Sequence, residues 1–353
     1  MERRRFLQMV SAAAAAGAVG TVPAWTLAAG RSSPTAGRGI GRRPQGGDLP
    51  GIVLVQNPWT ASALNAEVAK ILIEENLGNS VEITAIDENT MFAGLAAGDL
   101  DACLEVWPSG VTAEEQAYLD DATVVQLGPL GAIGQIGWYV PRYVQEQFPE
   151  TVTWEGFLDP EVASQFASAE TGDLGRFLGT DPSYSQYDEA IIENLGLPLQ
   201  VVFSGSEAAT VAALDSAVAA EEPILMYWWV PTAAAAKYDL VPVELPEYTD
   251  ECYADPAEIA CAYPTDVLVK IAGAHLADKD PAVSNFLSWF ALTNEDQSSM
   301  LPAVEIDGEP ADEVAAQWVA DNEAVWSEWL SGDPPPSVPA ASTPATAPAT
   351  TSG

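Results

Sequence analysis

The chain has 353 residues, of which 48% are hydrophobic and 18% are charged, so it is long enough to form two ordinary domains. It carries 51 acidic and 13 basic residues, and because seven of the bases precede residue 44, the body holds six bases against 50 acids, a charge of −44. A surface this acidic repels phosphate backbones and anionic lipids, which excludes nucleic acid and membrane surfaces as partners.

The N-terminus indicates export. Residues 1–30 are predicted to be a twin-arginine signal peptide, because residues 3–7 (R-R-R-F-L) fit the pattern R-R-x-F-L and an Ala-rich run follows. A structural helix is the alternative interpretation. Gln8, the glycines and Pro23 make the run a poor membrane span, so no direct span is expected after signal removal. Residues 31–47 are rich in Gly, Arg and Pro and are predicted to be a flexible linker.

The body alternates strand and helix patterns. Short apolar or alternating runs predict strands at 52–55, 81–85 and 102–106. Apolar residues at helical spacing predict helices at 64–77 and 91–97 between them. This β-α-β-α-β order is typical of a parallel sheet with helices on its faces.

A second series of strands and helices follows, and a tail ends the chain. The predicted elements of this series are strands at 136–140, 199–203 and 224–229 and helices at 142–148, 187–195, 207–219, 281–292 and 311–330. Two α/β units are expected, with their strand ends facing a shared crevice where ligands bind. Residues 331–353 alternate Ala, Pro and Thr and are predicted to be a disordered tail.

Three cysteines constrain the compartment and the metal chemistry. Cys252 and Cys261 are close enough in sequence to form a loop-closing disulfide in an oxidising compartment. Cys103 lies in an apolar stretch and is expected to be a buried free thiol. Metal ligation is a weaker interpretation of these cysteines than a disulfide and a buried thiol, because the chain has a single histidine and no C-x-x-C pair. Neither a metal nor a cofactor is expected.

Signals for catalysis are weak. His275 lies in a helix-like stretch without an evident partner, and the chain has no G-x-S-x-G, phosphate loop or H-E-x-x-H. Acidic pairs such as Asp87-Glu88 are interpreted as solvated helix ends. The sequence therefore predicts a binding protein and not an enzyme.

Aromatic residues are the informative class. Trp59, Trp107, Trp138, Tyr184 and Trp229 lie where a predicted strand ends and the chain turns, which is where an open α/β sheet binds ligands. The alternative for each ring is a place in the core or at its rim. That alternative is preferred for Trp154, Trp228 and Trp289.

An ordered set of segments carries a family resemblance. The segments are L-E-V-W-P-S-G (104–110), G-W-Y-V-P (137–141), D-P-S-Y-S-Q-Y-D-E (181–189), G-S-E-A-A (205–209), Y-W-W-V-P (227–231) and C-A-Y-P-T-D-V-L-V-K-I (261–271). Their set resembles the glycine betaine, choline and proline-betaine binding proteins of osmoprotectant ABC importers over residues 51–300. The resemblance implies a two-lobed periplasmic-binding-protein fold with hinge closure. The lobes would be 48–132 with 239–330, and 133–238.

The resemblance also implies roles for single residues. Trp107, Tyr184 and Trp229 match the main cage aromatics of the family, Trp59 matches an aromatic of choline-binding relatives, and Trp138 lies near another. Backbone N–H groups of two residues would receive a ligand carboxylate: Ser185 and Gln186. Tyr184 departs from the pattern, because some relatives have Trp or Asn there, which leaves the cage geometry open. A trimethylammonium group donates no conventional hydrogen bond, so charge–π attraction and methyl packing are the forces available to such a cage.

The expected function is capture of glycine betaine or a related quaternary-ammonium osmolyte outside the cytoplasm, in the periplasm or at the outer face of the cell membrane. The expected partners are that ligand and the permease and ATPase subunits of an ABC importer. A choline- or carnitine-specific protein, or a surface sensor using the same cage, is the alternative. Choline-binding relatives place an acid two residues beyond the first Trp, and Ala61 stands there here. Because the turn at Ser185 and Gln186 offers donors to a carboxylate instead, betaine is expected to bind at least tenfold tighter than choline in molar salt. The charge excess also favours a salty habitat, although it could serve only solubility.

Overall fold

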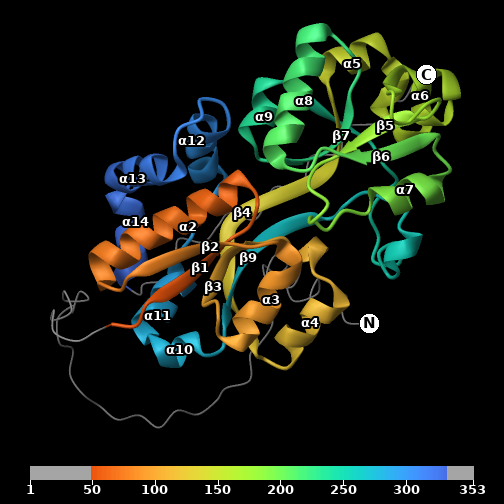
Figure 1. Ribbon diagram of the computed structural model, residues 1–353. Coiled ribbons are helices and arrows are strands. Elements are labelled where there is room, and N and C mark those ends of the chain that lie inside the picture. The colour runs from red at the N-terminus through yellow and green to blue at the C-terminus, as the bar shows by residue number, and fades with distance from the viewer. Residues whose placement is uncertain (1–48, 332–353) are drawn as a thin grey trace, which may run out of the picture.

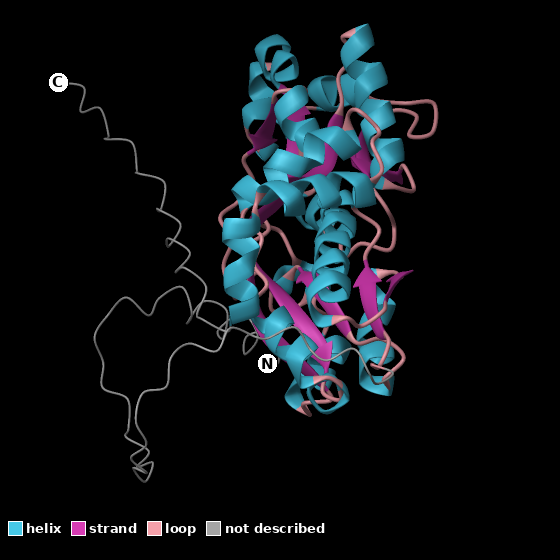
Figure 2. Cartoon of the chain, turned by 90° about the vertical axis from the view of Figure 1, so that its left-hand side faces the viewer, coloured by secondary structure: helices cyan, strands magenta, loops and turns pink. Residues whose placement is uncertain are grey.

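The protein forms two α/β lobes that lie along one continuous sheet (Figure 1). The structure is a computed structural model that describes residues 49–331. The expected signal peptide (1–30), the linker (31–47) and all but the first residue of the expected tail (331–353) lie outside the described residues. Figure 2 shows the two lobes one above the other, each with strands between helices.

Nine strands make up the sheet, in the order β2-β1-β3-β9-β4-β7-β5-β6, with β8 paired to β4. Their bounds are β1 (Ile52–Gln56), β2 (Val81–Ala85), β3 (Ala102–Val106), β4 (Val124–Pro141), β5 (Gly175–Gly179), β6 (Leu199–Phe203), β7 (Leu225–Val230), β8 (Leu240–Val243) and β9 (Thr265–Gly273). The α/β class and the two-lobed fold expected from the sequence are confirmed.

The first lobe is built on β1, β2 and β3, which are parallel, and on the antiparallel β9. Alternate residues of these strands face opposite sides. Leu54 and Leu104 pack with α2 (Thr60–Leu72), and Val55 and Cys103 pack with α3 (Glu88–Ala97). The π-helical turn η1 (Ile73–Leu77) follows α2. The other elements of this lobe are η2 (Pro108–Gly110), α4 (Ala113–Asp120), α10 (Leu276–Lys279), α11 (Pro281–Trp289), α12 (Asn294–Glu305), α13 (Ala311–Asp321) and α14 (Glu323–Ser331).

Two long strands, β4 and β9, join the lobes. The first half of β4 pairs with β9, and its second half pairs with β7 and β8. Its register against β9 shifts around Gly128 and Gly131, whose φ angles are 102° and 111°. Only glycine adopts that backbone readily, so the Gly-rich sequence of β4 permits the bulges that bend it from one lobe into the other.

The second lobe is built on the parallel pairs β5–β6 and β5–β7. Its helices are α5 (Arg142–Gln147), η3 (Pro149–Val152), η4 (Trp154–Leu158), α6 (Pro160–Ala163), η5 (Ser164–Phe166), α7 (Asp188–Leu195), α8 (Glu207–Ala220) and α9 (Ala233–Lys237). Strand β5 was missed by the sequence analysis, because two of its five residues are glycine and its pattern carries little alternation.

The chain returns to the first lobe later than the expected boundary at residue 239. Strand β8 pairs with β4 at Trp138–Pro141, beyond the part of β4 that contacts β9. The loop after β8 contains η6 (Pro256–Glu258) and the disulfide between Cys252 and Cys261, and Asn194 of α7 donates to carbonyls in it. We therefore place the return crossing at β9.

The last helices fold back onto the first lobe, where α12 and α13 lie against α2 (Figure 1). The single helix expected at 311–330 is two helices that separate at Asn322. None of the helices between residues 49 and 331 has both the length and the apolar character needed to cross a membrane.

Candidate functional site

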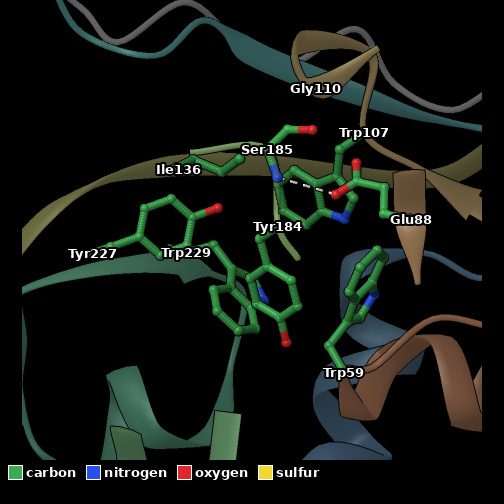
Figure 3. A pocket seen from close by; sticks show the side chains of 9 residues that line it. All are labelled: Trp59, Glu88, Trp107, Gly110, Ile136, Tyr184, Ser185, Tyr227 and Trp229. Atoms are coloured by element: carbon green, nitrogen blue, oxygen red, sulfur yellow. Dashed lines mark hydrogen bonds between the residues drawn. The ribbon is translucent and has the colours of Figure 1, made fainter. Parts of the chain in front are cut away.

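One pocket lies between the lobes, at the ends of β1, β3 and β7 (Figure 3). It encloses about 360 Å³, counting the part open to solvent. Aromatic rings make up most of its wall. The lining residues are Trp59, Glu88, Trp107, Gly110, Ile136, Tyr184, Ser185, Tyr227 and Trp229.

Two of the expected rings come from the first lobe and share one acceptor. Trp59 follows β1 as the N-cap residue of α2, and Trp107 follows β3. Both indole N–H groups donate to Oε1 of Glu105, at 2.8 Å from Trp59 and 3.1 Å from Trp107. Oε2 of Glu105 accepts from Asn65 at 2.5 Å. Glu105 thus fixes the orientation of both rings through their indole N–H groups.

Burying Glu105 shifts its pKa, and placing the Trp107 ring requires a residue without a side chain in β4. Burial raises the pKa of Glu105 to about 7, against the lowering effect of the hydrogen bonds from both indoles. The six-membered ring of Trp107 packs on the backbone of Gly134 in β4, where any Cβ would overlap two of its atoms. Glycine at position 134 therefore makes room for the ring.

The other rings come from the second lobe. Tyr184 lies in the loop after β5, and its ring meets Trp59 edge-on at a centroid distance of 5.5 Å and Trp229 at 5.9 Å. Trp229 of β7 stacks on the fully buried Trp228 at 4.5 Å. Tyr227, two residues earlier on β7, lines the same pocket. The rings of both lobes therefore form one continuous cage (Figure 3).

Hydrogen bonds around the pocket hold the lobes together. The hydroxyl of Tyr184 donates to the carbonyl of Pro58 at 2.6 Å. The backbone N–H and the hydroxyl of Thr60 both donate to Oε2 of Glu207, which stands at the start of α8. The amide of Asn89 donates to the carbonyl of Ser183 at 2.9 Å. This conformation is one in which the lobes have met across the cage.

Among the described residues that line the pocket, Glu88 alone carries a carboxyl group. Glu88 begins α3, directly after the turn that ends β2, and the residue is 7% exposed. Burial and, to a smaller extent, the nearby charge of Glu115 together raise its pKa to about 8. The interpretation of Asp87-Glu88 as a solvated helix end is wrong for Glu88, because its side chain is buried against Ser185 of the other lobe, although Asp87 and Asn89 beside it are exposed.

The two expected backbone donors are already hydrogen-bonded. The N–H of Ser185 donates to Oε2 of Glu88 at 3.3 Å (Figure 3), and that of Gln186 donates to the carbonyl of Tyr184 at 2.9 Å. The side chain of Gln186 donates to the carbonyl of Asp181 and does not line the pocket. Ser185 is thus a wall residue of the pocket, whereas Gln186 stabilises the turn behind it.

Trp138 is placed differently from the expectation. It is fully buried in the second lobe, packs against Phe177 at 4.7 Å and donates to Oδ1 of Asp188 at 2.7 Å. Ile136, two residues earlier on β4, lines the pocket, whereas Trp138 does not. A buried acceptor and a neighbouring ring satisfy Trp138 in the core, so its role as a cage residue is not supported by its position.

His275 and Cys103 lie outside the cage and have partners of their own. His275 does have a partner, because its Nε2 lies 2.8 Å from Oδ1 of Asp101, which also binds Lys279. Cys103 is buried, and its thiol donates to Asn57. Within residues 49–331, no three His, Cys, Asp or Glu side chains gather in an arrangement that could hold a metal ion.

Comparison with known proteins identifies the family of the chain. Residues 50–321 match the family described as "Substrate binding domain of ABC-type glycine betaine transport system". A trimethylamine N-oxide-binding protein of Pelagibacter ubique (strain HTCC1062) is 25% identical over 283 residues, which cover 78% of this chain and 89% of the relative.

Solved structures share the fold. Lactococcal OpuAC, closed on glycine betaine, superposes with a TM-score of 0.61 at 21% identity, over 79% of this chain and 99% of that one. An ABC-transporter choline-binding protein in complex with choline gives 0.65 at 17% identity, over 80% and 92%. The match to the family covers residues 50–321, which is more than half of the chain. The chain therefore belongs to the family of substrate-binding domains of ABC-type glycine betaine transport systems.

Proposed function

We propose that this protein captures a methylated-ammonium osmolyte, glycine betaine or a related quaternary amine, outside the cytoplasm and delivers it to the permease and ATPase of an ABC importer. The observation that carries the proposal is the cage of Trp59, Trp107, Tyr184 and Trp229 around one pocket between the lobes. A cation over an aromatic face gains up to about 2 kcal/mol when water is excluded. Three or four such contacts approach the roughly 8 kcal/mol of a micromolar site before ordering costs.

Closure of the lobes fits delivery. The bonds from Tyr184 to Pro58 and from Thr60 to Glu207 link the lobes beside the cage. A ligand that touches rings of both lobes favours the conformation in which they meet, so occupancy shifts the population toward a closed form that a permease can recognise. We expect binding and release without turnover of the ligand.

Calorimetry with the purified protein tests the ligand class. The panel is glycine betaine, choline, carnitine, proline betaine and trimethylamine N-oxide. The variant Trp229→Ala should weaken binding of the best ligand at least tenfold, or about 1.4 kcal/mol. Trp289→Ala, a half-buried tryptophan outside the pocket, is the matched control. Binding by none of the panel, or an equal loss in both variants, would contradict the proposal.

Export through the twin-arginine route is part of the proposal. It is supported by the arginine motif at residues 3–7. Replacing Arg3 and Arg4 together with Lys should leave the protein in the cytoplasmic fraction. Undiminished export of that variant would exclude the route without touching the ligand-binding proposal.

A further inference from the structure

Glu88 stands at the end of the cage that the sequence analysis assigned to a ligand carboxylate. Its Oε2 accepts the N–H of Ser185, which was the expected donor (Figure 3). Its Oε1 lies against Gly110, where a Cβ would come within 2.8 Å of it. The Glu88 carboxyl is therefore held between α3 and the turn at Gly110, and it belongs to the pocket wall.

Further donors near this end are also engaged. The N–H of Gln186 donates to a carbonyl, and the N–H and hydroxyl of Ser109 donate to Asp266 at 2.8 and 2.6 Å. Among the nine described residues that line the pocket, none is Lys, Arg or His. A ligand carboxylate placed here would find both expected backbone N–H groups occupied. Glu88 could donate to it only in its protonated form and would repel it when ionised.

The groups that face Glu88 from neighbouring elements add no positive charge. They are Glu115 of α4, Asp266 of β9, Cys103 of β3, Tyr184 after β5 and Tyr227 of β7. Each is an acid or a neutral hydroxyl or thiol. An additional anion is repelled by the carboxylates in this set, whereas a cation that retains its charge in the cage is attracted to them.

We propose that Glu88 is the specificity-determining residue of the cage, and that it selects a cation with a hydrogen-bond donor at its far end, of the choline type, over a zwitterion that carries a carboxylate there. The inference rests on the proposed function and is the opposite of the betaine preference expected from Ala61. The acid that choline-binding relatives place two residues after the first Trp is supplied here from another element, the start of α3.

Proton linkage follows from this arrangement. Burial raises the pKa of Glu88 to about 8, so the carboxyl of the empty pocket is mostly neutral at pH 7. A bound cation favours the ionised form, so choline binding releases the proton of Glu88 to solvent. Affinity for choline then rises with pH until about pH 8 and levels off above it.

Competition calorimetry of choline against glycine betaine, in about 1 M salt to screen the long-range field, tests the inference. We expect the wild type to bind choline more tightly than betaine, with a roughly tenfold gain in choline affinity between pH 6.5 and 8.5. Measurement in two buffers of different ionisation enthalpy should show proton release on choline binding. This arm needs no variant, so it stands even if a substitution at Glu88 impairs folding.

Variants locate the effect. Glu88→Gln should remove the pH slope and at least tenfold of the preference for choline. Glu114→Gln, an exposed neighbour on α4, should leave both unchanged. The inference is overturned if the wild type prefers betaine, if Glu88→Gln retains the slope, or if the slope disappears only in Asp266→Asn. If no methylated amine binds the wild type, the proposed function itself fails, which is a different result.

Discussion

Glu105 offers a test of how the cage is positioned. The variant Glu105→Ala leaves three buried donors without their acceptor, the indoles of Trp59 and Trp107 and the amide of Asn65. An unsatisfied buried donor costs about 1–3 kcal/mol, so the loss of the acceptor for three donors costs roughly 3–9 kcal/mol. Removal of the buried acid offsets part of it, because a pKa raised from 4.5 to about 7 corresponds to about 3 kcal/mol at pH 8.

The two contributions oppose each other in stability but not in binding. At pH 8 we expect Glu105→Ala to lower the free energy of unfolding by no more than about 6 kcal/mol, since loss of the buried charge offsets part of the cost of the lost acceptor. Binding of the best ligand should weaken at least tenfold, because neither Trp59 nor Trp107 is then held in orientation. Calorimetry gives the affinity, denaturant unfolding gives the stability, and tryptophan emission reports the freed indoles.

The conservative variant provides the control. Glu105→Gln retains one oxygen that can accept from both indoles, so its affinity should stay within about threefold of the wild type. If Glu105→Ala binds as tightly as the wild type, the rings are held by packing alone. If Glu105→Ala and Glu105→Gln weaken binding equally, the negative charge matters and the acceptor does not. Either result refutes the reasoning.

Three further predictions concern stability and closure. The thermal midpoint should rise with KCl from low to molar concentration, because the body charge of −44 is mostly self-repulsion; a flat or falling curve would show that the acids are already paired. The free energy of unfolding, measured by urea titration, should fall by at least about 2 kcal/mol from pH 5 to pH 7. Burial raises the pKa values of four carboxyl groups to about 7–8, so the folded state favours their neutral form and loses stability as pH rises; the groups are Glu88, Asp188, Asp266 and Glu305. A free energy of unfolding that is constant or rises over this range would contradict the prediction. Glu207→Ala removes the acceptor for Thr60 between the lobes, so small-angle scattering of the ligand-free protein should show a larger radius of gyration than the wild type, and no change would mean that other contacts set closure.

Much of the fold could be read from local pattern. Strands at 102–106 and 199–203 occur as expected, because short β-branched or apolar runs between turn signals admit few alternatives. Strand β5, with glycine at both ends, and the break at Asn322 were not detected. Their structure depends on neighbours distant in sequence, such as β6 and β7 on either side of β5.

The sequence by itself determined which aromatic rings come together between the lobes. Trp59, Trp107, Tyr184 and Trp229 were selected because parallel strands end in turns that share one crevice, and these four residues line one pocket. The same reasoning could have found Tyr227, since residues two apart on a strand share a face. It could not tell Trp138 from them, because only tertiary packing supplies the buried carboxylate that its indole meets.

The tertiary structure alone decided the polar end of the pocket. In the sequence Glu88 is an ordinary acid at a helix start, where carboxylates are common and are usually exposed. Its burial arises because a second lobe, nearly 100 residues further along the chain, places Ser185 against it. Residue type and periodicity are enough to predict the aromatic residues of the cage. Which polar groups remain free to contact a ligand depends on hydrogen bonds between residues distant in sequence, and these form only when the lobes meet.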